Sequence, residues 1–349
     1  MLNPNLKISP DIESFLQTLR NKKANHIPLA ELGVHPIIKE KLLSKKIIEL
    51  KDEVEFWYKA GYDYVKLQPK ADFNPKQIGL SENVSYNYDG SVFRKWASEN
   101  KGVITNDDEF EQYVFPATTD FDYSNFEKVK SFLPDGMGVI GQYGDIFTMT
   151  WEMMGFESFS FALFENEQLI KNLNDKLGNL VLDMFKNLCG SDTVDAVWYS
   201  DDIAYTNGLL VSPEVLDKYF FPWLKKIGGL AKLYNKPFIY HSDGILYDVM
   251  DRILECGVNA LHPIEPKAMN IAEVKKRYGD KLCLIGNIDV DLLSRGSKEE
   301  VRKNVLDNIE QVGLNGGYCV GSGNSIPEYV NFENYLTMIE TVKDFNKSL

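Results

Sequence analysis

The feature that most constrains this chain is a regular alternation of short apolar runs and amphipathic segments from residue 137 onward. Apolar runs of this length are typical of buried strands, and the segments between them carry apolar residues at helical spacing. Strands that alternate with helices are joined by crossovers and therefore lie parallel. The strands predicted in this part of the chain are 137–141, 195–199, 237–240, 259–262, 282–285 and 317–320.

Two further strands are predicted near the N-terminus, at residues 26–30 and 62–67. A total of eight strands with intervening helices in 349 residues favours a (β/α)8 TIM barrel over a doubly wound sheet. The sequence contains no GxGxxG motif and no P-loop, so no dinucleotide or P-loop nucleotide site is predicted. We therefore expect an α/β protein whose single barrel domain spans residues 1–349.

The periodicity fails between about residues 69 and 130. Turn-forming residues gather over 83–89, an alternating segment covers 91–96, and a polar-aromatic stretch follows at 110–123. We predict an insertion after the second strand, built from a hairpin and short helices, that serves as a lid or as an interface.

The composition excludes several classes of partner. The net charge is −13, which argues against binding to nucleic acid or to anionic membrane surfaces, because both attract Lys and Arg. The N-terminus lacks the pattern of a signal peptide, and no apolar run approaches the length of a membrane span. The four cysteines show no CxxC spacing, so no disulfide framework is predicted. These features predict a cytoplasmic protein.

The stretch 236–245 carries the most reactive side chains at one strand end. An apolar run over 237–240 is followed directly by His241, Ser242 and Asp243, and then by Gly244 and an amphipathic segment. In parallel α/β proteins the chemistry gathers at the carboxyl ends of the strands. An isolated turn of this kind could equally be a polar strand end with a helix-capping aspartate.

Other predicted strands end in the same way, which favours a functional rim over separate structural turns. In a barrel these side chains would converge at one end. The residues that follow the predicted strands are Gln142 and Tyr143, Asp201 and Asp202, His262 and Glu265, Asn287 and Asp289, and Ser322 and Asn324.

These same segments resemble the uroporphyrinogen decarboxylase superfamily, which includes corrinoid-dependent methyltransferases. The resemblance covers nearly the whole chain and is weakest at about 69–130. It implies a distorted (β/α)8 barrel with a deep cleft at the carboxyl ends of the strands. The matching segments are GQYGDIFTMTWEMMGFE (141–157), SDDIAYTNGLLVSPEVLDKYFFPWLKKI (200–227), YHSDGILYDVMDRILECGVNALHPIEP (240–266), YGDKLCLIGNID (278–289) and GGYCVGSGNSIPEYVNFENY (316–335).

The chain departs from the decarboxylase pattern. Decarboxylases of the family hold a polycarboxylate tetrapyrrole with arginines of the first loop and an aspartate after the second strand. Here the first loop, residues 31–35, has no arginine, and residues 68–70 offer no matching aspartate. The late histidine of the family falls near Asn324. Arginine is the efficient ligand for carboxylates, and the chain has only six, so uroporphyrinogen-type decarboxylation is the less favoured alternative.

The chain also departs from the zinc-dependent methylcobamide:thiol methyltransferases of the superfamily, which hold zinc through His-x-Cys and a later Cys. The corresponding residues here are His241, Asp243 and Asn324, and Cys319 lies too early. A thiolate zinc site is therefore not predicted. A zinc site of nitrogen and oxygen ligands, formed by His241, Asp243 and Glu265, remains possible.

The branch of the superfamily that the chain best resembles implies a methyltransferase of the O-demethylase type. Such an enzyme moves a methyl group from a small substrate, here a methoxylated aromatic, to the Co(I) centre of a separate corrinoid (cobalamin) protein. An ether oxygen leaves readily only when it is protonated or bound to a Lewis acid. We expect His241, Asp243 and Glu265 to serve as catalytic residues or metal ligands. The expected substrate-binding residues are Gln142, Tyr143, Trp151, Tyr199, Asp202, Asn287, Ser322 and Asn324.

Two other classes stay open at this point. One is a methyltransferase that acts on an amine, a thioether or a halide. The other is a non-catalytic relative that only binds a small molecule, which the many polar strand ends make less favoured.

Overall fold

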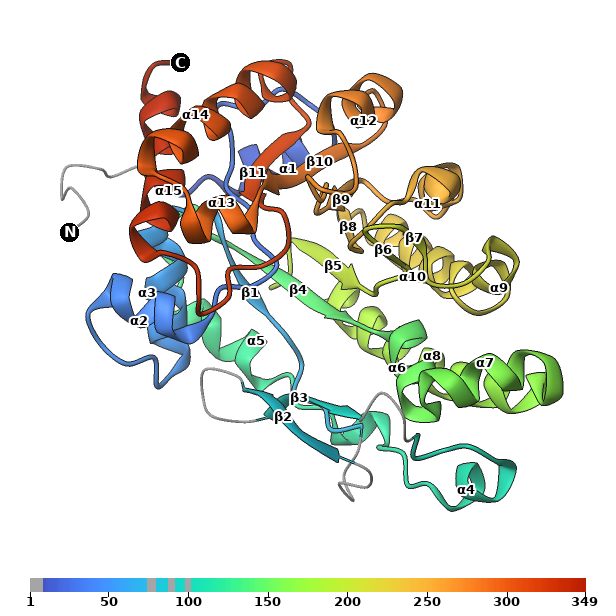
Figure 1. The fold of residues 1–349 in the computed structure, drawn as a ribbon. Coiled ribbons are helices and arrows are strands. Elements are labelled where there is room, and N and C mark those ends of the chain that lie inside the picture. The colour runs from blue at the N-terminus through green and yellow to red at the C-terminus, as the bar shows by residue number, and fades with distance from the viewer. Residues whose placement is uncertain (1–8, 74–79, 87–91, 98–101) are drawn as a thin grey trace.

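The computed structural model describes residues 9–73, 80–86, 92–97 and 102–349. Its centre is a curled parallel sheet in which each strand pairs with the next one along the chain (Figure 1). This order agrees with the predicted α/β class. The seven strands, in their order in the sheet, are β1 (Tyr64–Leu67), β4 (Gly138–Gly144), β5 (Ala196–Ser200), β8 (Phe238–His241), β9 (Ala260–His262), β10 (Cys283–Ile288) and β11 (Tyr318–Ser322).

The strand predicted at 26–30 is not a full strand of this sheet, which corrects the count of eight. Leu29 forms a single parallel bridge with Val320 of β11. Val320 N donates to Pro28 O at 2.9 Å, and Ala30 N donates to Val320 O at 2.8 Å. Proline has no amide hydrogen, so Pro28 cannot donate a ladder hydrogen bond of its own. Within the described residues the sheet is therefore a seven-stranded half-barrel with a short bridging segment beside β11.

Helices cover the outer face of the sheet (Figure 1). The chain between β4 and β5 contains three helices, which are separated at Gly155 and Asn166. The helices are α1 (Ile12–Leu19), α2 (Pro36–Leu43), α3 (Leu50–Ala60), α6 (Ile146–Met154), α7 (Phe156–Glu165), α8 (Glu167–Gly190), α9 (Pro213–Tyr219), α10 (Phe221–Leu233), α11 (Met250–Glu255), α12 (Ile271–Tyr278), α13 (Val290–Arg295), α14 (Lys298–Asn308) and α15 (Phe332–Lys347).

The long helix α8 shows how the helical layer is fixed to the rest of the fold. Its buried residues, among them Leu173, Leu177 and Leu188, recur at the spacing of one helix face. Trp223 of α10 packs over Gly178, where a Cβ would lie 2.2 Å from the indole. The Trp223 indole N–H donates to Asn174 at 2.7 Å, so this close crossing of α8 and α10 is also satisfied by a buried hydrogen bond.

The chain between β1 and β4 contains an antiparallel pair of strands, β2 (Leu80–Tyr86) and β3 (Val92–Ala97), and the short helices α4 (Asp107–Gln112) and α5 (Ser124–Lys128). Part of the predicted insertion, residues 74–79, 87–91 and 98–101, lies outside the described residues. That this part of the chain forms a separate insertion after the second strand stays a prediction. The service of its strands and helices as a lid or as an interface also stays a prediction.

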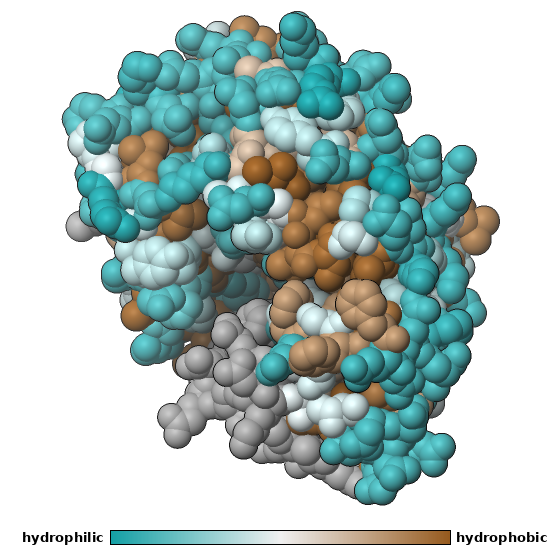
Figure 2. Space-filling model, turned by 45° about the vertical axis from the view of Figure 1, so that its right-hand side comes forward, coloured by the Kyte–Doolittle hydropathy of each residue, from teal (hydrophilic) through white to brown (hydrophobic). Residues whose placement is uncertain are grey.

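Helix α7 presents apolar side chains to solvent, unlike most of the helical layer. Phe161 and Phe164 are 59% and 91% exposed. Other helices carry ion pairs on their outer faces, such as Lys171 with Asp175 on α8 and Lys303 with Asp307 on α14. Figure 2 turns this side of the molecule forward and shows apolar residues gathered in the middle of the face, with hydrophilic residues around them.

Within the described part of the chain, no helix combines the length and the apolar character that crossing a bilayer requires.

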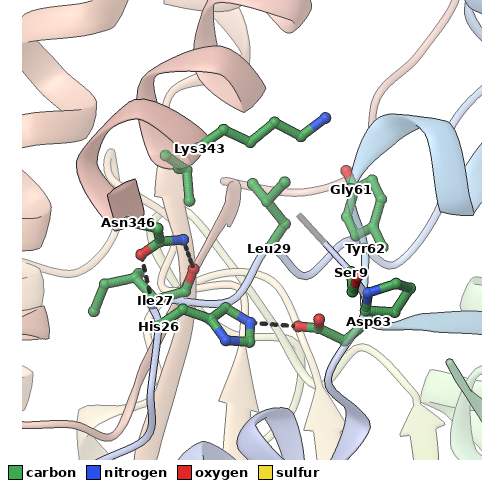
Figure 3. Close-up of a pocket in the computed structure, with 11 residues that line it drawn as sticks. Ser9, His26, Ile27, Leu29, Gly61, Tyr62, Asp63, Lys343 and Asn346 are labelled. Atoms are coloured by element: carbon green, nitrogen blue, oxygen red, sulfur yellow. Dashed lines mark hydrogen bonds and ion pairs between the residues drawn. The ribbon is translucent and has the colours of Figure 1, made fainter. Parts of the chain in front are cut away.

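A small pocket lies at the amino ends of the strands, where His26 and Asp63 meet (Figure 3). His26 Nε2 is 2.8 Å from Asp63 Oδ2, and the Asn346 side chain donates to Ile27 O and accepts from Ile27 N. The hydrogen bond and charge of Asp63 outweigh burial and raise the pKa of His26. Residues at this end of a barrel serve stability rather than chemistry.

Candidate functional site

A cleft of about 490 Å³ opens at the carboxyl ends of the strands. It lies where the chain leaves β5, β8, β9, β10 and β11, as expected for a parallel α/β fold. The polar residues that line it are Asp202, Thr206, Asp243, Glu265, Lys267, Asp289, Asp291, Asn324 and Ser325, and Tyr205 and Tyr329 add aromatic surface.

Asp202, His241 and Asp243 form a compact group at this end of the sheet. One oxygen of each carboxyl group and one ring nitrogen of His241 all lie within 4.8 Å of one another. His241 Nε2 is 3.7 Å from Asp202 Oδ1, which also accepts from the backbone N–H of Asp243 at 2.8 Å. The sequence stretch predicted to be reactive thus brings two of its side chains together with a residue that follows β5.

The ring of His241 is oriented by a second histidine. Strands β8 and β9 place His241 opposite His262, and their Nδ1 atoms are 2.8 Å apart. Burial lowers the pKa of His241 to about 3 and that of His262 well below its usual value, so both rings are neutral at pH 7. One Nδ1–H therefore donates to the other Nδ1, which leaves His241 Nε2 directed toward Asp202.

Asp243 is held by Asn324, whose side-chain amide donates to Oδ2 at 2.6 Å. Its other oxygen, Oδ1, is buried and has no hydrogen-bond partner among the described residues. Burial, followed by the charges of Asp202 and Glu265, raises the pKa of Asp243 to about 8. Asp243 is therefore a carboxyl group that can carry a proton at neutral pH.

Glu265 lies in the same cleft but outside the compact group, which changes the ligand set expected from the sequence. Its oxygens accept from Gly244 N at 2.9 Å and from Thr206 Oγ1 at 3.2 Å. Glu265 thus closes the loop after β8, while Asp202 takes the place next to His241 that was expected for Glu265.

Three of the expected substrate-binding residues lie away from this cleft. The Tyr199 hydroxyl is buried and donates to Asp201 Oδ2 at 2.6 Å. The ring of Tyr143 lies 6.0 Å from that of Phe73, and Trp151 packs edge-on against Phe156. None of the three lines the cleft that holds Asp243, because their rings pack among other side chains; their contact with a substrate stays a prediction.

Gln142, Asn287 and Ser322 also make contacts within the barrel rather than in the cleft. Gln142 donates to Ser200 Oγ at 2.8 Å, and Asn287 donates to the carbonyl of Ile264. Ser322 donates through both N and Oγ to Glu31. Of the expected substrate-binding residues, Asp202 and Asn324 are the two that line the cleft.

Asp201, the neighbour of Asp202, has a structural role. Its carboxyl group accepts from Phe147 N at 2.7 Å and from Thr148 N at 2.9 Å, at the start of α6. Burial and the nearby Asp145 raise its pKa to about 7. The two adjacent aspartates therefore divide their roles: Asp201 fixes a helix and Asp202 faces the cleft.

Sequence reasoning missed two titratable groups whose pKa values are shifted by burial, Lys66 and Glu31. Lys66 donates to Gln142 Oε1 at 3.0 Å, and burial, then Lys39, lowers its pKa to about 7. Glu31 is fully buried. Glu31 directly follows the apolar run 26–30, and Lys66 lies near the end of the predicted strand 62–67, so their places beside strand ends could have identified both.

Glu31→Gln is expected to flatten the pH dependence of stability. Burial raises the pKa of Glu31 to about 8, so the folded protein binds this proton more tightly than the unfolded chain. The stability that this proton contributes is fully present below about pH 4.5 and is lost as the pH rises through about 8. The loss amounts to roughly 3–5 kcal/mol of unfolding free energy. In urea unfolding from about pH 5 to about pH 8, the unfolding free energy of the wild type should fall relative to that of the variant as the pH rises. Parallel curves for the two proteins would contradict this assignment.

Comparisons with known proteins agree with this architecture. A family model described as uroporphyrinogen decarboxylase (URO-D) matches residues 98–345. The uroporphyrinogen decarboxylase of Pseudoalteromonas translucida (strain TAC 125) is 35% identical over 188 residues, which is 52% of this chain and 50% of that protein. The enzyme of the same name from Trichodesmium erythraeum (strain IMS101) is 27% identical over 141 residues, 40% of this chain and 38% of that protein. The matches thus span half or less of these curated relatives.

Among solved structures, a methyltransferase from Methanosarcina mazei is similar with a TM-score of 0.69 over 95% of this chain and 98% of that chain. The two sequences are 15% identical, so the likeness shows a common fold.

Proposed function

Because the chain belongs to the uroporphyrinogen decarboxylase family, we propose that it is a methyltransferase built on that fold. It would move a methyl group from a small methylated substrate to the Co(I) centre of a separate corrinoid protein. A methoxylated aromatic is the first substrate to test.

The charge of the cleft favours methyl transfer over decarboxylation as the function of this site. Lys267 is the single basic residue among those that line it, and this lysine is paired with Asp291. A tetrapyrrole with many carboxylates would meet repulsion here instead of bidentate guanidinium contacts. A small neutral methyl donor meets no such cost. The carboxylates of the cleft are Asp202, Asp243, Glu265, Asp289 and Asp291.

Removal of a methyl group from an ether needs a proton for the departing oxygen. The carbon–oxygen bond breaks with its electrons on oxygen, the methyl group passes to the Co(I) nucleophile of the partner, and one proton completes the free hydroxyl. Asp243, whose pKa is raised to about 8, can donate that proton. Asn324 fixes the carboxyl group, and the nearby Glu265 disfavours loss of the proton from Asp243 before the substrate binds.

A metal ion offers a second way to activate the oxygen. Asp202, His241 and Asp243 supply two oxygens and one nitrogen within 4.8 Å of one another, a donor set that suits a catalytic zinc with one open position. The other ring nitrogen of His241, Nδ1, is hydrogen-bonded to His262. A hydrogen bond at this second nitrogen commonly orients a histidine that binds a metal. A zinc ion held there would act as a Lewis acid on the substrate oxygen.

The acceptor is proposed to belong to a partner protein. The four cysteines of the chain are free and buried, which fits a reducing compartment such as the cytoplasm. The Co(I) state of the corrinoid acceptor also needs reducing surroundings. The hairpin and helices between β1 and β4 are proposed as the lid or the docking surface for the corrinoid protein.

The test is an assay of methoxylated aromatics with the protein, a corrinoid protein and a reductant. We expect a free phenol and a methylated corrinoid in equal amounts. Release of CO₂ from uroporphyrinogen, with no methyl transfer from any methylated donor, would instead identify a decarboxylase. Methylated amines, thioethers and halides in the same assay distinguish the other donor classes.

Asp243→Asn is expected to lower turnover by roughly 10²–10⁴-fold, because the amide cannot give up a proton. Asp217→Asn, which changes an aspartate that pairs with Arg252 and does not line the cleft, is the matched control and should change the rate little. Metal analysis of both proteins separates the two mechanisms. A loss of stoichiometric zinc in Asp243→Asn would assign the effect to a metal, whereas an equal rate in the two variants would remove Asp243 from the reaction.

A further inference from the structure

The segment that bridges to β11, residues 28–31, ends with an unusual hydrogen bond. Val320 N bonds to Pro28 O and Ala30 N bonds to Val320 O, as in a parallel ladder. The next rung of such a ladder would join Ser322 N to the carbonyl of Ala30. Instead, Ser322 N donates to the side chain of Glu31, with 2.7 Å to Oε1. A side chain thus continues the pairing at the point where the backbone ladder stops.

Glu31 is held firmly in this place. Its second oxygen, Oε2, is 2.7 Å from Ser322 Oγ. Its own backbone N–H donates to the Tyr64 hydroxyl at 3.0 Å, and its side chain is fully buried. Two hydrogen bonds to one residue leave Ser322 little freedom of position.

Ser322 leads directly into the part of the loop that reaches the cleft. Gly323 N donates to Ile288 O at 2.7 Å, and a Cβ on Gly323 would lie 2.6 Å from Pro266 Cδ. Asn324 follows and donates to Asp243. Because this turn is short and closely packed, a displacement of Ser322 is passed on to the Asn324 side chain.

We propose that Glu31 is a positioning residue that acts through Ser322 to hold the Asn324 amide against Asp243. Glu31 does not line the cleft, so it touches no substrate itself. The contribution of this contact to methyl transfer rests on the proposed function. The contact between Asn324 and Asp243 does not, and it can be measured without turnover.

The direct measurement uses protein labelled with ¹⁵N at asparagine, in which Asn324→Ala identifies the Asn324 side-chain amide signals. Glu31→Leu removes both acceptors at similar volume, and we expect these signals to move. Glu31→Gln offers the same carbonyl to Ser322 N and an amide to Ser322 Oγ, and we expect it to restore the wild-type positions. Glu300→Gln changes a carboxyl group that also accepts from the N and Oγ of one serine, Ser297, and should leave the signals in place.

A double-mutant cycle gives the functional measurement. Glu31→Leu is expected to lower kcat by roughly 10–100-fold with little change in KM, as for a small misplacement of a reacting group. In the Asn324→Ala background the same change should cost little more, because the residue through which Glu31 acts is already gone. Full additivity in the cycle would overturn the proposal.

Ser322→Ala guards against a Glu31→Leu protein that does not fold. It removes the hydroxyl contact alone, and we expect the Asn324 signals to move in the direction seen on loss of Glu31, by a smaller amount. Unchanged Asn324 signals in folded Glu31→Leu, or in Ser322→Ala where the first protein does not fold, would refute the positioning role. Wild-type protein without methyl transfer, combined with shifted signals in the variants, would overturn the proposed function and keep the positioning role.

Discussion

Replacing His241 with alanine is expected to abolish methyl transfer while the protein still folds. The side chain brings a neutral ring nitrogen to within 3.7 Å of Asp202, beside the carboxyl group of Asp243. His262 fixes the direction of that nitrogen. Without the ring, neither a metal nor a substrate oxygen can be held between the two carboxyl groups, so the rate should fall by at least about 10²-fold. The assay is phenol formation from a methoxylated aromatic, with circular dichroism as the check on folding.

His26→Ala is the matched control for this experiment. His26 is also largely buried and is hydrogen-bonded to an aspartate, but it lies at the opposite end of the barrel in the small pocket with Asp63 (Figure 3). We expect His26→Ala to lower the unfolding free energy and to leave turnover of the folded protein near normal. Near-normal turnover in His241→Ala would show that the reaction does not use this end of the sheet.

The sequence predicted the sheet well because the strands are short apolar runs bounded by clear turns. The run 195–199 corresponds to β5 at Ala196–Ser200, and 237–240 corresponds to β8 at Phe238–His241. The first predicted strand, 26–30, was the exception. Residues 26–30 have the apolar pattern of a strand, but strand pairing depends on backbone N–H donors, and Pro28 has none.

The sequence predicted the place of a site residue correctly where that residue directly follows a strand. It failed where another residue forms a hydrogen bond with the side chain and holds it away from the cleft. His241, Asp243 and Asn324 follow strand ends and do meet. Tyr199 was expected beside the substrate, yet its hydroxyl is bonded to Asp201. Local spacing shows on which strand a residue lies, but a long-range partner decides where its side chain points.

The same limit applies to the buried ion pair of Lys39 on α2 with Glu53 on α3, which no sequence pattern indicated. Both side chains are at least nine-tenths buried. The Trp57 indole also donates to Glu53 Oε1 at 2.9 Å, while Glu53 Oε2 has no hydrogen-bond partner in the part of the chain that the structure describes. This pair joins α2 to α3, and α3 packs beside β1.

Lys39→Ala is therefore expected to be among the most destabilising single changes in the protein. It leaves the Glu53 carboxylate buried with the Trp57 indole as its one donor, and loss of one member of a buried pair costs roughly 3–5 kcal/mol. Lys45→Ala is the matched control, because Lys45 is 42% exposed where it pairs with Asp52 and Glu55, and exposed pairs contribute little to stability. Urea unfolding measures both variants.

The double variant Lys39→Met with Glu53→Gln separates the ion pair from the packing around it. If the cost of Lys39→Ala arises from an uncompensated charge, removal of both charges should recover most of the lost stability. If it arises from the lost contacts of the lysine chain with Phe56 and Trp57, Lys39→Met alone should recover it, since methionine refills that space. A Lys39→Ala protein within about 1 kcal/mol of the wild type would mean that Glu53 reaches solvent or binds its proton in the folded state.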